Sequence, residues 1–235
     1  EYPLYLSSAN FLTSNGILNI VSTDTRRLAM SGVPVFESSD GVNALLPMKG
    51  IKEVQRILSS LNSDSPVEIL YDDAQFYFRA ESLEFTVRRV ESRFPAYEKI
   101  LPKGHQTFVS LDRGNLISAL ERVDVIVRDY NRMVVLDIVK GEVLVMRGKA
   151  PDFGQAMEEI SAEITGDDLR IAVNSKFFME ALKVLRDPNV TLAFNGMSGH
   201  MAVKRVETDS FLCLIAPINL SEEELNMDEM ESSSK

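Results

Sequence analysis

Three times along this chain a short apolar strand is followed by an amphipathic helix and then by further strands, and this repeat limits what the chain can fold into. The three complete copies open at residues 44–47, 107–111 and 170–174. A fourth copy begins the sequence with strands expected at 4–11, 17–22 and 27–33, without a strand and helix before them. Repetition of one supersecondary unit predicts modules that stack or are related by symmetry.

Each expected helix has apolar residues at spacings of three and four, which places them on one face and predicts that this face is buried. These residues are Ile51, Val54, Ile57, Leu58 and Leu61 in the first helix, Leu116, Leu120 and Val123 in the second, and Phe178, Ala181, Leu182 and Leu185 in the third.

The segments after the helices alternate between apolar runs and polar turns, which is typical of hairpins. The expected strand pairs are 67–71 with 75–80, 134–139 with 142–147, and 189–194 with 200–206. Two β-α-β-β-β units can form adjoining antiparallel sheets with both helices packed on one side, so the sequence predicts an α+β fold. Paired units then predict one domain at 1–103 and another at 104–220. The acidic, serine-containing segment 221–235 is expected to be a disordered tail.

The composition excludes several classes of protein. The chain has 235 residues, 45% of them hydrophobic, and a single cysteine, so a disulfide framework or a cysteine-based zinc site is not expected. Cys213 lies in an apolar run and is predicted to be a buried strand residue. Since we find neither a membrane-length apolar run nor a signal peptide, we expect a cytoplasmic protein.

The charge of the chain is unevenly distributed. The formal net charge is -10, which disfavours contact with nucleic acid except at a local basic patch. The three helical segments carry eight bases against four acids (Glu53, Glu121, Glu180 and Asp187), a local charge of 8 − 4 = +4. Taken alone, this is more often an ordinary solvated helix surface than a binding site.

The sequence has no motif for nucleotide binding, zinc-dependent hydrolysis or a nucleophilic serine, so we expect no catalytic residue, no metal and no cofactor. His105 and His200 lie in an expected linker and at a hairpin edge. The pair Asp72 and Asp73 and the pair Asp167 and Asp168 occupy expected turns, where acids bond to the local backbone.

Four segments together resemble a known family. They are 22–29 (STDTRRLA), 45–50 (LLPMKG), 93–97 (RFPAY) with 100–102 (ILP), and 216–220 (APINL). In order and spacing they are similar to the bacterial replicative sliding clamp, the beta subunit of DNA polymerase III, over about residues 1–220. The resemblance implies a clamp fold with antiparallel sheets outside and helices lining the inner face.

The resemblance also implies a function. Members of this family form a head-to-tail homodimeric ring that encircles duplex DNA without sequence preference and tethers the polymerase, and they are not enzymes. The lysine and arginine side chains of the helices would then face the DNA phosphates. These DNA-facing residues are Lys49, Lys52, Arg56, Arg113, Arg122, Lys176, Lys183 and Arg186.

A second implied surface is a hydrophobic groove between the middle and last domains. There the polymerase, the clamp loader and other partners insert a Gln-Leu-x-Leu-Phe type peptide. Carried over by position, the groove residues are Leu6, Thr23, Thr25, Arg26, Arg27, Leu28, Pro95, Lys99, Ile100, Phe177, Leu214, Ala216, Pro217 and Ile218.

The chain departs from the family pattern at several positions. Thr25 and Arg26 stand where a Gly-His pair is common, Ala216 replaces a frequent methionine, and Asn131 replaces an aromatic residue. The tail is an addition, which we expect to weaken peptide binding electrostatically. The resemblance also implies that the family's first domain, and the first strand and helix of the middle domain, are not in this chain. We therefore expect no ring closure by this chain alone.

Two other interpretations remain open. One is an adaptor whose sheets bind proteins and never meet DNA. The other is a metal-dependent hydrolase that uses the turn carboxylates Asp72, Asp73 and Asp168.

Overall fold

The computed structural model describes residues 3–36, 41–61, 65–206, 208 and 210–221. The chain divides into two compact units, Glu1–Leu101 and Pro102–Lys235. The division lies two residues before the boundary expected at residue 103. The tail expected at 221–235 falls, from residue 222 onward, outside the described residues.

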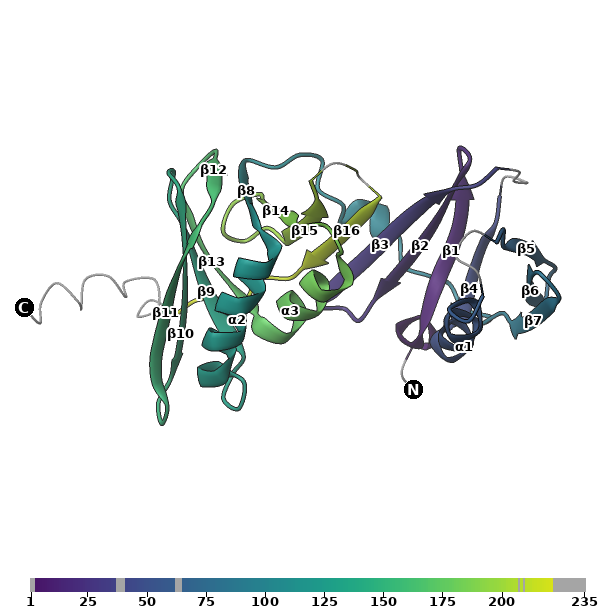
Figure 1. The fold of residues 1–235 in the computed structure, drawn as a ribbon, viewed down its shortest axis with the longest axis horizontal. Coiled ribbons are helices and arrows are strands. Elements are labelled where there is room, and N and C mark those ends of the chain that lie inside the picture. The colour runs from purple at the N-terminus through teal and green to yellow at the C-terminus, as the bar shows by residue number, and fades with distance from the viewer. Residues whose placement is uncertain (1–2, 37–40, 62–64, 207, 209, 222–235) are drawn as a thin grey trace, which may run out of the picture. The chain divides into compact units, whose positions relative to one another are not determined.

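The first unit contains the incomplete copy of the repeat and the first complete copy (Figure 1). Its elements are η1 (Leu4–Ser7), β1 (Ser8–Ser14), β2 (Ile17–Thr23), β3 (Arg27–Pro34), β4 (Asn43–Pro47), α1 (Met48–Leu58), β5 (Glu68–Tyr71), β6 (Gln75–Ala80), β7 (Leu83–Arg88) and η2 (Tyr97–Lys99). Its strands form two antiparallel sheets, ordered β3-β2-β1-β4 and β5-β6-β7.

The second unit contains the other two complete copies. Its elements are β8 (Thr107–Asp112), α2 (Arg113–Val127), β9 (Met133–Ile138), β10 (Val143–Ala150), β11 (Gly154–Ser161), β12 (Glu163–Thr165), β13 (Leu169–Asn174), α3 (Ser175–Val184), β14 (Asn189–Phe194), β15 (Met201–Arg205) and β16 (Phe211–Ile215). Within this unit the antiparallel strands are ordered β12-β8-β14-β15-β16 and β11-β10-β9-β13. The predicted repeat and α+β class are therefore confirmed.

Side chains at the helix starts explain why α2 and α3 begin where they do. The Asp112 carboxylate accepts the backbone N–H of Asn115 at 2.7 Å. The Asn174 amide oxygen accepts the N–H groups of Lys176 at 3.0 Å and Phe177 at 3.2 Å. Such caps satisfy backbone donors that the first helical turn leaves free. In Figure 1 α2 and α3 lie next to each other beside the sheet that contains β9, β10 and β11.

The predicted apolar helix faces are buried in the second unit. Leu116, Leu120 and Val123 of α2 are fully buried, as are Phe178 and Leu182 of α3. In the first unit Val54 of α1 joins a core of strand residues that includes Phe11, Leu46, Phe76 and Val87. Leu61 and Leu185 were expected in the first and third helices. Both lie beyond the last residues of α1 and α3, so the expectation is wrong for these two positions.

One strand prediction is wrong. Residues 4–7 form a 3₁₀ helix, η1, and the strand starts only at Ser8. The N–H of Leu6 donates to the Pro3 carbonyl at 3.1 Å, and the hydroxyl of Ser8 donates to the Leu4 carbonyl at 2.9 Å. These local bonds take the backbone groups that a strand would offer to its neighbour. The short strand β12 is an element that the sequence did not predict.

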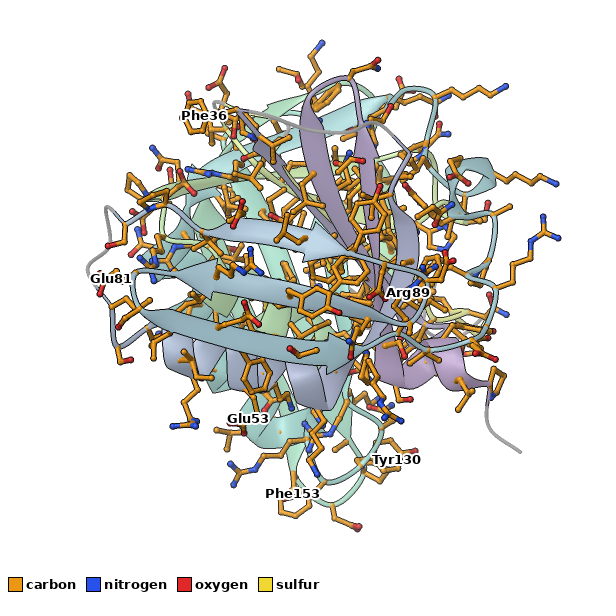
Figure 2. The ribbon with its side chains drawn as sticks, turned by 90° about the vertical axis from the view of Figure 1, so that its right-hand side faces the viewer. Phe36, Glu53, Glu81, Arg89, Tyr130 and Phe153 are labelled. Atoms are coloured by element: carbon orange, nitrogen blue, oxygen red, sulfur yellow. The ribbon has the colours of Figure 1, made fainter. Side chains whose placement is uncertain are left out.

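Figure 2 shows the sheet β5-β6-β7 with Glu81 at the turn between β6 and β7 and Arg89 just after β7. Behind this sheet Gly50 of α1 lies so close to β7 that a Cβ there would come within 2.5 Å of a Val87 methyl group. Among the described residues no helix is long and apolar enough to cross a membrane.

Candidate peptide-binding and DNA-facing surfaces

The turn between β2 and β3 carries four of the expected groove residues, Thr23, Thr25, Arg26 and Arg27, and is held by Asp24. Its carboxylate accepts the backbone N–H groups of Arg26 and Arg27 at 3.1 and 3.0 Å and the Arg27 Nε–H at 2.9 Å. The Thr23 hydroxyl donates to the Arg27 carbonyl at 2.7 Å, and Thr25 has a φ of 75°. The turn therefore presents Thr25 and Arg26 to solvent on a backbone held by local hydrogen bonds.

The segment after β7 is anchored by aromatic side chains. Tyr97 is 7% exposed, and its ring meets Phe94 edge to face at 5.9 Å, while Phe94 meets Tyr5 at 6.1 Å. Burial raises the pKa of the Tyr97 hydroxyl, with the Glu98 charge adding to the effect. On this anchor the expected groove residues Pro95, Lys99 and Ile100 are exposed.

Two further groove candidates of the first unit differ in accessibility. Leu6, on η1, is half-buried, whereas Leu28 is 2% exposed. Leu28 pairs with Thr23 across β2 and β3 and packs as a core residue in this structure. Leu28 can therefore support the turn from beneath but offers almost no surface to a ligand.

A cavity of about 460 Å³ lies beside the aromatic anchor in the first unit. Its lining includes Asn10, Pro95 and Tyr97. Asn10 is 3% exposed, and its amide oxygen has no hydrogen-bond partner among the described residues.

The groove candidates of the second unit lie on α3, on β16 and on the segment that follows β16. Phe177 is half-buried, Leu214 is fully buried, and Ala216, Pro217 and Ile218 are half-buried. The Ile218 N–H donates to the Ala172 carbonyl at 2.8 Å, which fixes the segment against β13. Leu214, like Leu28, is a packing residue here.

The eight helix bases fall into three groups. Lys49, Lys52, Lys176 and Arg186 are exposed and form no ion pair with any other residue that the structure describes. Arg56, Arg122 and Lys183 are exposed but paired with Glu53, Glu158 and Glu121. Arg113 is half-buried, and its Nε–H donates to the Asp187 carbonyl at 2.8 Å.

The pairing of Arg122 was not foreseen because its partner, Glu158, comes from β11 and not from a helix. Two guanidinium nitrogens donate to the two Glu158 oxygens at 2.8 and 2.6 Å. This hydrogen bonding lowers the pKa of Glu158 and raises that of Arg122. Arg113 and Arg122 are nine residues apart, a separation of half a turn, so they do not share a face of α2.

The turn carboxylates have structural partners. Asp72 accepts the backbone N–H groups of Ala74 and Gln75 at 2.7 and 2.8 Å and the Tyr77 hydroxyl at 2.9 Å. These bonds lower the pKa of Asp72, in that order of importance. Asp168 accepts the Lys140 N–H at 2.6 Å. Within the described part of the chain, no three His, Cys, Asp or Glu side chains are grouped as a metal ion would need.

His105 is half-buried, and Cys213 is buried. The ring of His105 lies 5.8 Å from that of Phe108, and burial, with Lys204 nearby, lowers its pKa. Cys213 is buried in β16, which confirms the prediction for this residue.

Comparisons with known proteins agree with this architecture. Residues 1–96 match the model of the DNA polymerase III beta subunit central domain, and residues 98–219 match that of its C-terminal domain. A beta sliding clamp from Staphylococcus epidermidis is 27% identical over 214 residues, which cover 91% of this chain and 56% of the relative.

Solved structures give the same result. The DNA polymerase III beta subunit from Thermotoga maritima aligns with a TM-score of 0.85 and 27% identity, covering 92% of this chain and 58% of that one. A sliding clamp from Pseudomonas aeruginosa bound to griselimycin aligns with a TM-score of 0.87 and 27% identity, covering 94% of this chain and 59% of that one. The chain thus spans somewhat more than half the length of these relatives.

Proposed function

Because the chain belongs to the DNA polymerase III beta subunit family, the non-enzymatic sliding clamps of DNA replication, we propose that it provides a clamp's peptide-binding groove. We propose further that the exposed lysines and arginines of its helices face duplex DNA in an assembled clamp. Since the chain spans 56% of its curated relative, ring formation and tethering of the polymerase are proposals for a complete clamp. Membership of a non-enzymatic family argues against the hydrolase interpretation.

The observation that carries the groove proposal is the combination of a rigid polar turn with accessible apolar side chains at the expected positions. Asp24 holds the turn through hydrogen bonds to its backbone. Arg26 and the Thr25 hydroxyl can then form hydrogen bonds with a peptide backbone or a glutamine side chain. Ile100 is 46% exposed, although it is a large apolar residue in an ordered segment. Burying the Leu and Phe side chains of a peptide against such residues gives roughly 1.5–3 kcal/mol each.

The half-buried segment 216–218 supports the contribution of the second unit. Pro217 cannot donate a backbone hydrogen bond, and the N–H of its neighbour Ile218 is already used by Ala172. The segment therefore offers mainly apolar surface and carbonyl groups. With Ala216 in place of a larger side chain, the pocket for the peptide's apolar residues would be wider.

Binding of a labelled Gln-Leu-x-Leu-Phe peptide tests this proposal. We expect Arg27→Ala, which removes the side chain that bonds to Asp24, to weaken peptide binding about tenfold, a cost of about 1.4 kcal/mol. Pro217→Ala should weaken it several-fold through lost apolar contact. Fluorescence anisotropy gives the dissociation constants, and Arg79→Ala, at an ion-paired arginine on β6, is the matched control. If the first two variants bind as tightly as the control, the assignment of the groove is wrong.

The salt dependence of DNA binding tests the second surface. Replacing Lys49, Lys52, Lys176 and Arg186 by Gln should lower the slope of log affinity against log salt by as much as roughly 3–4, because each phosphate contact contributes about 0.9. The control replaces four other exposed bases, namely Arg88, Lys103, Lys140 and Lys149. Since the net charge is -10, the titration is done with duplex DNA at low ionic strength. Equal slopes for both quadruple variants would favour the adaptor that never meets DNA.

A further inference from the structure

The sheet β3-β2-β1-β4 of the first unit has two faces with different surroundings. Ala9 and Phe11 of β1 belong to the core cluster that α1 joins through Val54. Successive strand residues point to opposite faces, so Asn10 faces away from this core. Asn10 is paired with Leu45 of β4 in the antiparallel register, and paired residues share a face. The face opposite the core therefore carries a polar side chain among apolar ones.

The segment after β7 covers this second face and forms a cavity with it. The segment is tied to β4 where the Val90 N–H donates to the Leu45 carbonyl at 2.8 Å. Farther along, it is anchored by the ring contact between Phe94 and the buried Tyr97. The cavity of about 460 Å³ is lined from both sides, because strand residues and segment residues both contribute to it. Its lining includes Asn10, Leu12, Leu45, Phe94, Pro95 and Tyr97.

Asn10 supplies a buried hydrogen-bonding group to this lining. The residue is 3% exposed, and its side-chain oxygen accepts no hydrogen bond from any residue that the structure describes. A buried acceptor without a donor has lost its bonds to water and gained none in return, which destabilises the folded state. The terminal torsion of an asparagine side chain has broad minima, so the oxygen can turn toward a donor in the cavity. A ligand N–H would then replace the missing hydrogen bond.

The other lining residues indicate what kind of ligand fits. Arg93 and Glu98 line the cavity, are both exposed and carry opposite charges, so the site favours neither an anion nor a cation. The side chains of Leu12, Leu45 and Phe94 favour an apolar body, as in most small-molecule pockets. A primary carboxamide on such a body can donate to the Asn10 oxygen and accept an N–H of the same side chain.

We propose that this cavity binds a small uncharged molecule in which a primary carboxamide is attached to a flat apolar body. The carboxamide pairs with the side chain of Asn10, and the apolar body lies between the strands and the segment after β7. Among the expected groove residues only Pro95 also lines the cavity. The site is therefore distinct from the peptide groove and does not depend on the proposed clamp function.

Two ligands of nearly equal size test the proposal. Benzamide carries the carboxamide, whereas methyl benzoate has an ester at that place and no N–H donor. For ligands this small we expect benzamide to bind with a dissociation constant on the order of 1 mM and methyl benzoate about tenfold more weakly. In an NMR titration, benzamide should shift the backbone signals of residues 10, 45 and 94–97. Equal affinities, or shifts confined to other residues, would overturn the proposal.

Asn10→Leu is the matched variant, because leucine has the same branched shape without a hydrogen-bonding group. It removes a buried acceptor that lacks a donor, so we expect the variant to fold with an unchanged or higher melting temperature. Its affinities for the two ligands should differ by less than about twofold. A folded variant that still prefers benzamide about tenfold would contradict pairing with Asn10. The comparison of the two ligands on the unchanged chain decides the proposal even if this variant does not fold.

Competition with the Gln-Leu-x-Leu-Phe peptide tests whether the cavity is a separate site. We expect the peptide to leave the shifts caused by benzamide unchanged, since the cavity and the expected groove share only Pro95. Displacement of benzamide by the peptide would make the cavity part of the groove and contradict a separate site. Failure of the peptide to bind at all would count against the groove and leave the benzamide result as it is.

Discussion

Replacing Gly166 by alanine is expected to lower the free energy of unfolding of the second unit by about 3 kcal/mol or more, because two costs add. Gly166 has a φ of 102°, a conformation that side chains with a Cβ rarely adopt. A Cβ would also lie 1.9 Å from the Gln106 carbonyl oxygen and 2.7 Å from the Thr107 Cα, which are both backbone atoms. The short connection between β12 and β13 must therefore move away from the start of β8.

Gly16→Ala is the matched control for this change. Gly16 also has a positive φ, of 71°, but nothing lies within 4 Å of its added Cβ. Only the conformational cost of roughly 1–2 kcal/mol is then expected. Urea denaturation followed by circular dichroism measures both variants. If both substitutions lower the free energy of unfolding by the same amount, the backbone of Gln106 and Thr107 does not pack closely against Gly166.

Phe76→Ala is expected to destabilise the first unit by about 3–5 kcal/mol, since it empties the centre of an aromatic cluster. Phe76 is 1% exposed, and its ring lies 5.9 Å from that of Phe11 and 5.6 Å from that of Tyr71. Because the two units have separate cores, the midpoint temperature for unfolding of the second unit should not change.

Phe36→Ala provides the comparison, as Phe36 is fully exposed and projects from the surface (Figure 2). Its loss should change stability by less than about 0.5 kcal/mol. Calorimetry can separate the transitions of the two units. Equal shifts of both transitions by Phe76→Ala would contradict the independence of the two cores.

The repeat and most of its strands could be predicted from the sequence, because apolar runs and turn residues are local signals. Asn15 and Gly16 both adopt positive φ in a two-residue turn, as an Asn-Gly pair between apolar runs predicts. The error at residues 4–7 has a local cause that hydropathy does not report. There Leu4, Tyr5 and Leu6 are as apolar as strand residues, but the Ser7 and Ser8 hydroxyls both bond to the Leu4 carbonyl and stabilise a helical turn.

The surfaces were harder to predict because they depend on long-range contacts. The lysines and arginines of the helices are visible in the sequence, but their partners are not. Arg122 pairs with Glu158 and Arg113 bonds to Asp187, at separations of 36 and 74 residues. The groove positions were predicted from the resemblance alone. The structure shows that Leu28 and Leu214 are buried packing residues, whereas Ile100 is accessible. Asp24 and Tyr97, which hold the accessible residues in place, were not among the candidates.

The most direct test of the groove is to map the bound peptide on this chain by NMR. Backbone amide and methyl signals are followed while an unlabelled Gln-Leu-x-Leu-Phe peptide is added. We predict that the shifts concentrate at residues 23–27, at Ile100, at Phe177 and at 216–218, while the sheet β5-β6-β7 is unaffected. Binding that shifts signals elsewhere, or the absence of any shift at millimolar peptide, would contradict the proposal that this chain carries a clamp's peptide-binding groove.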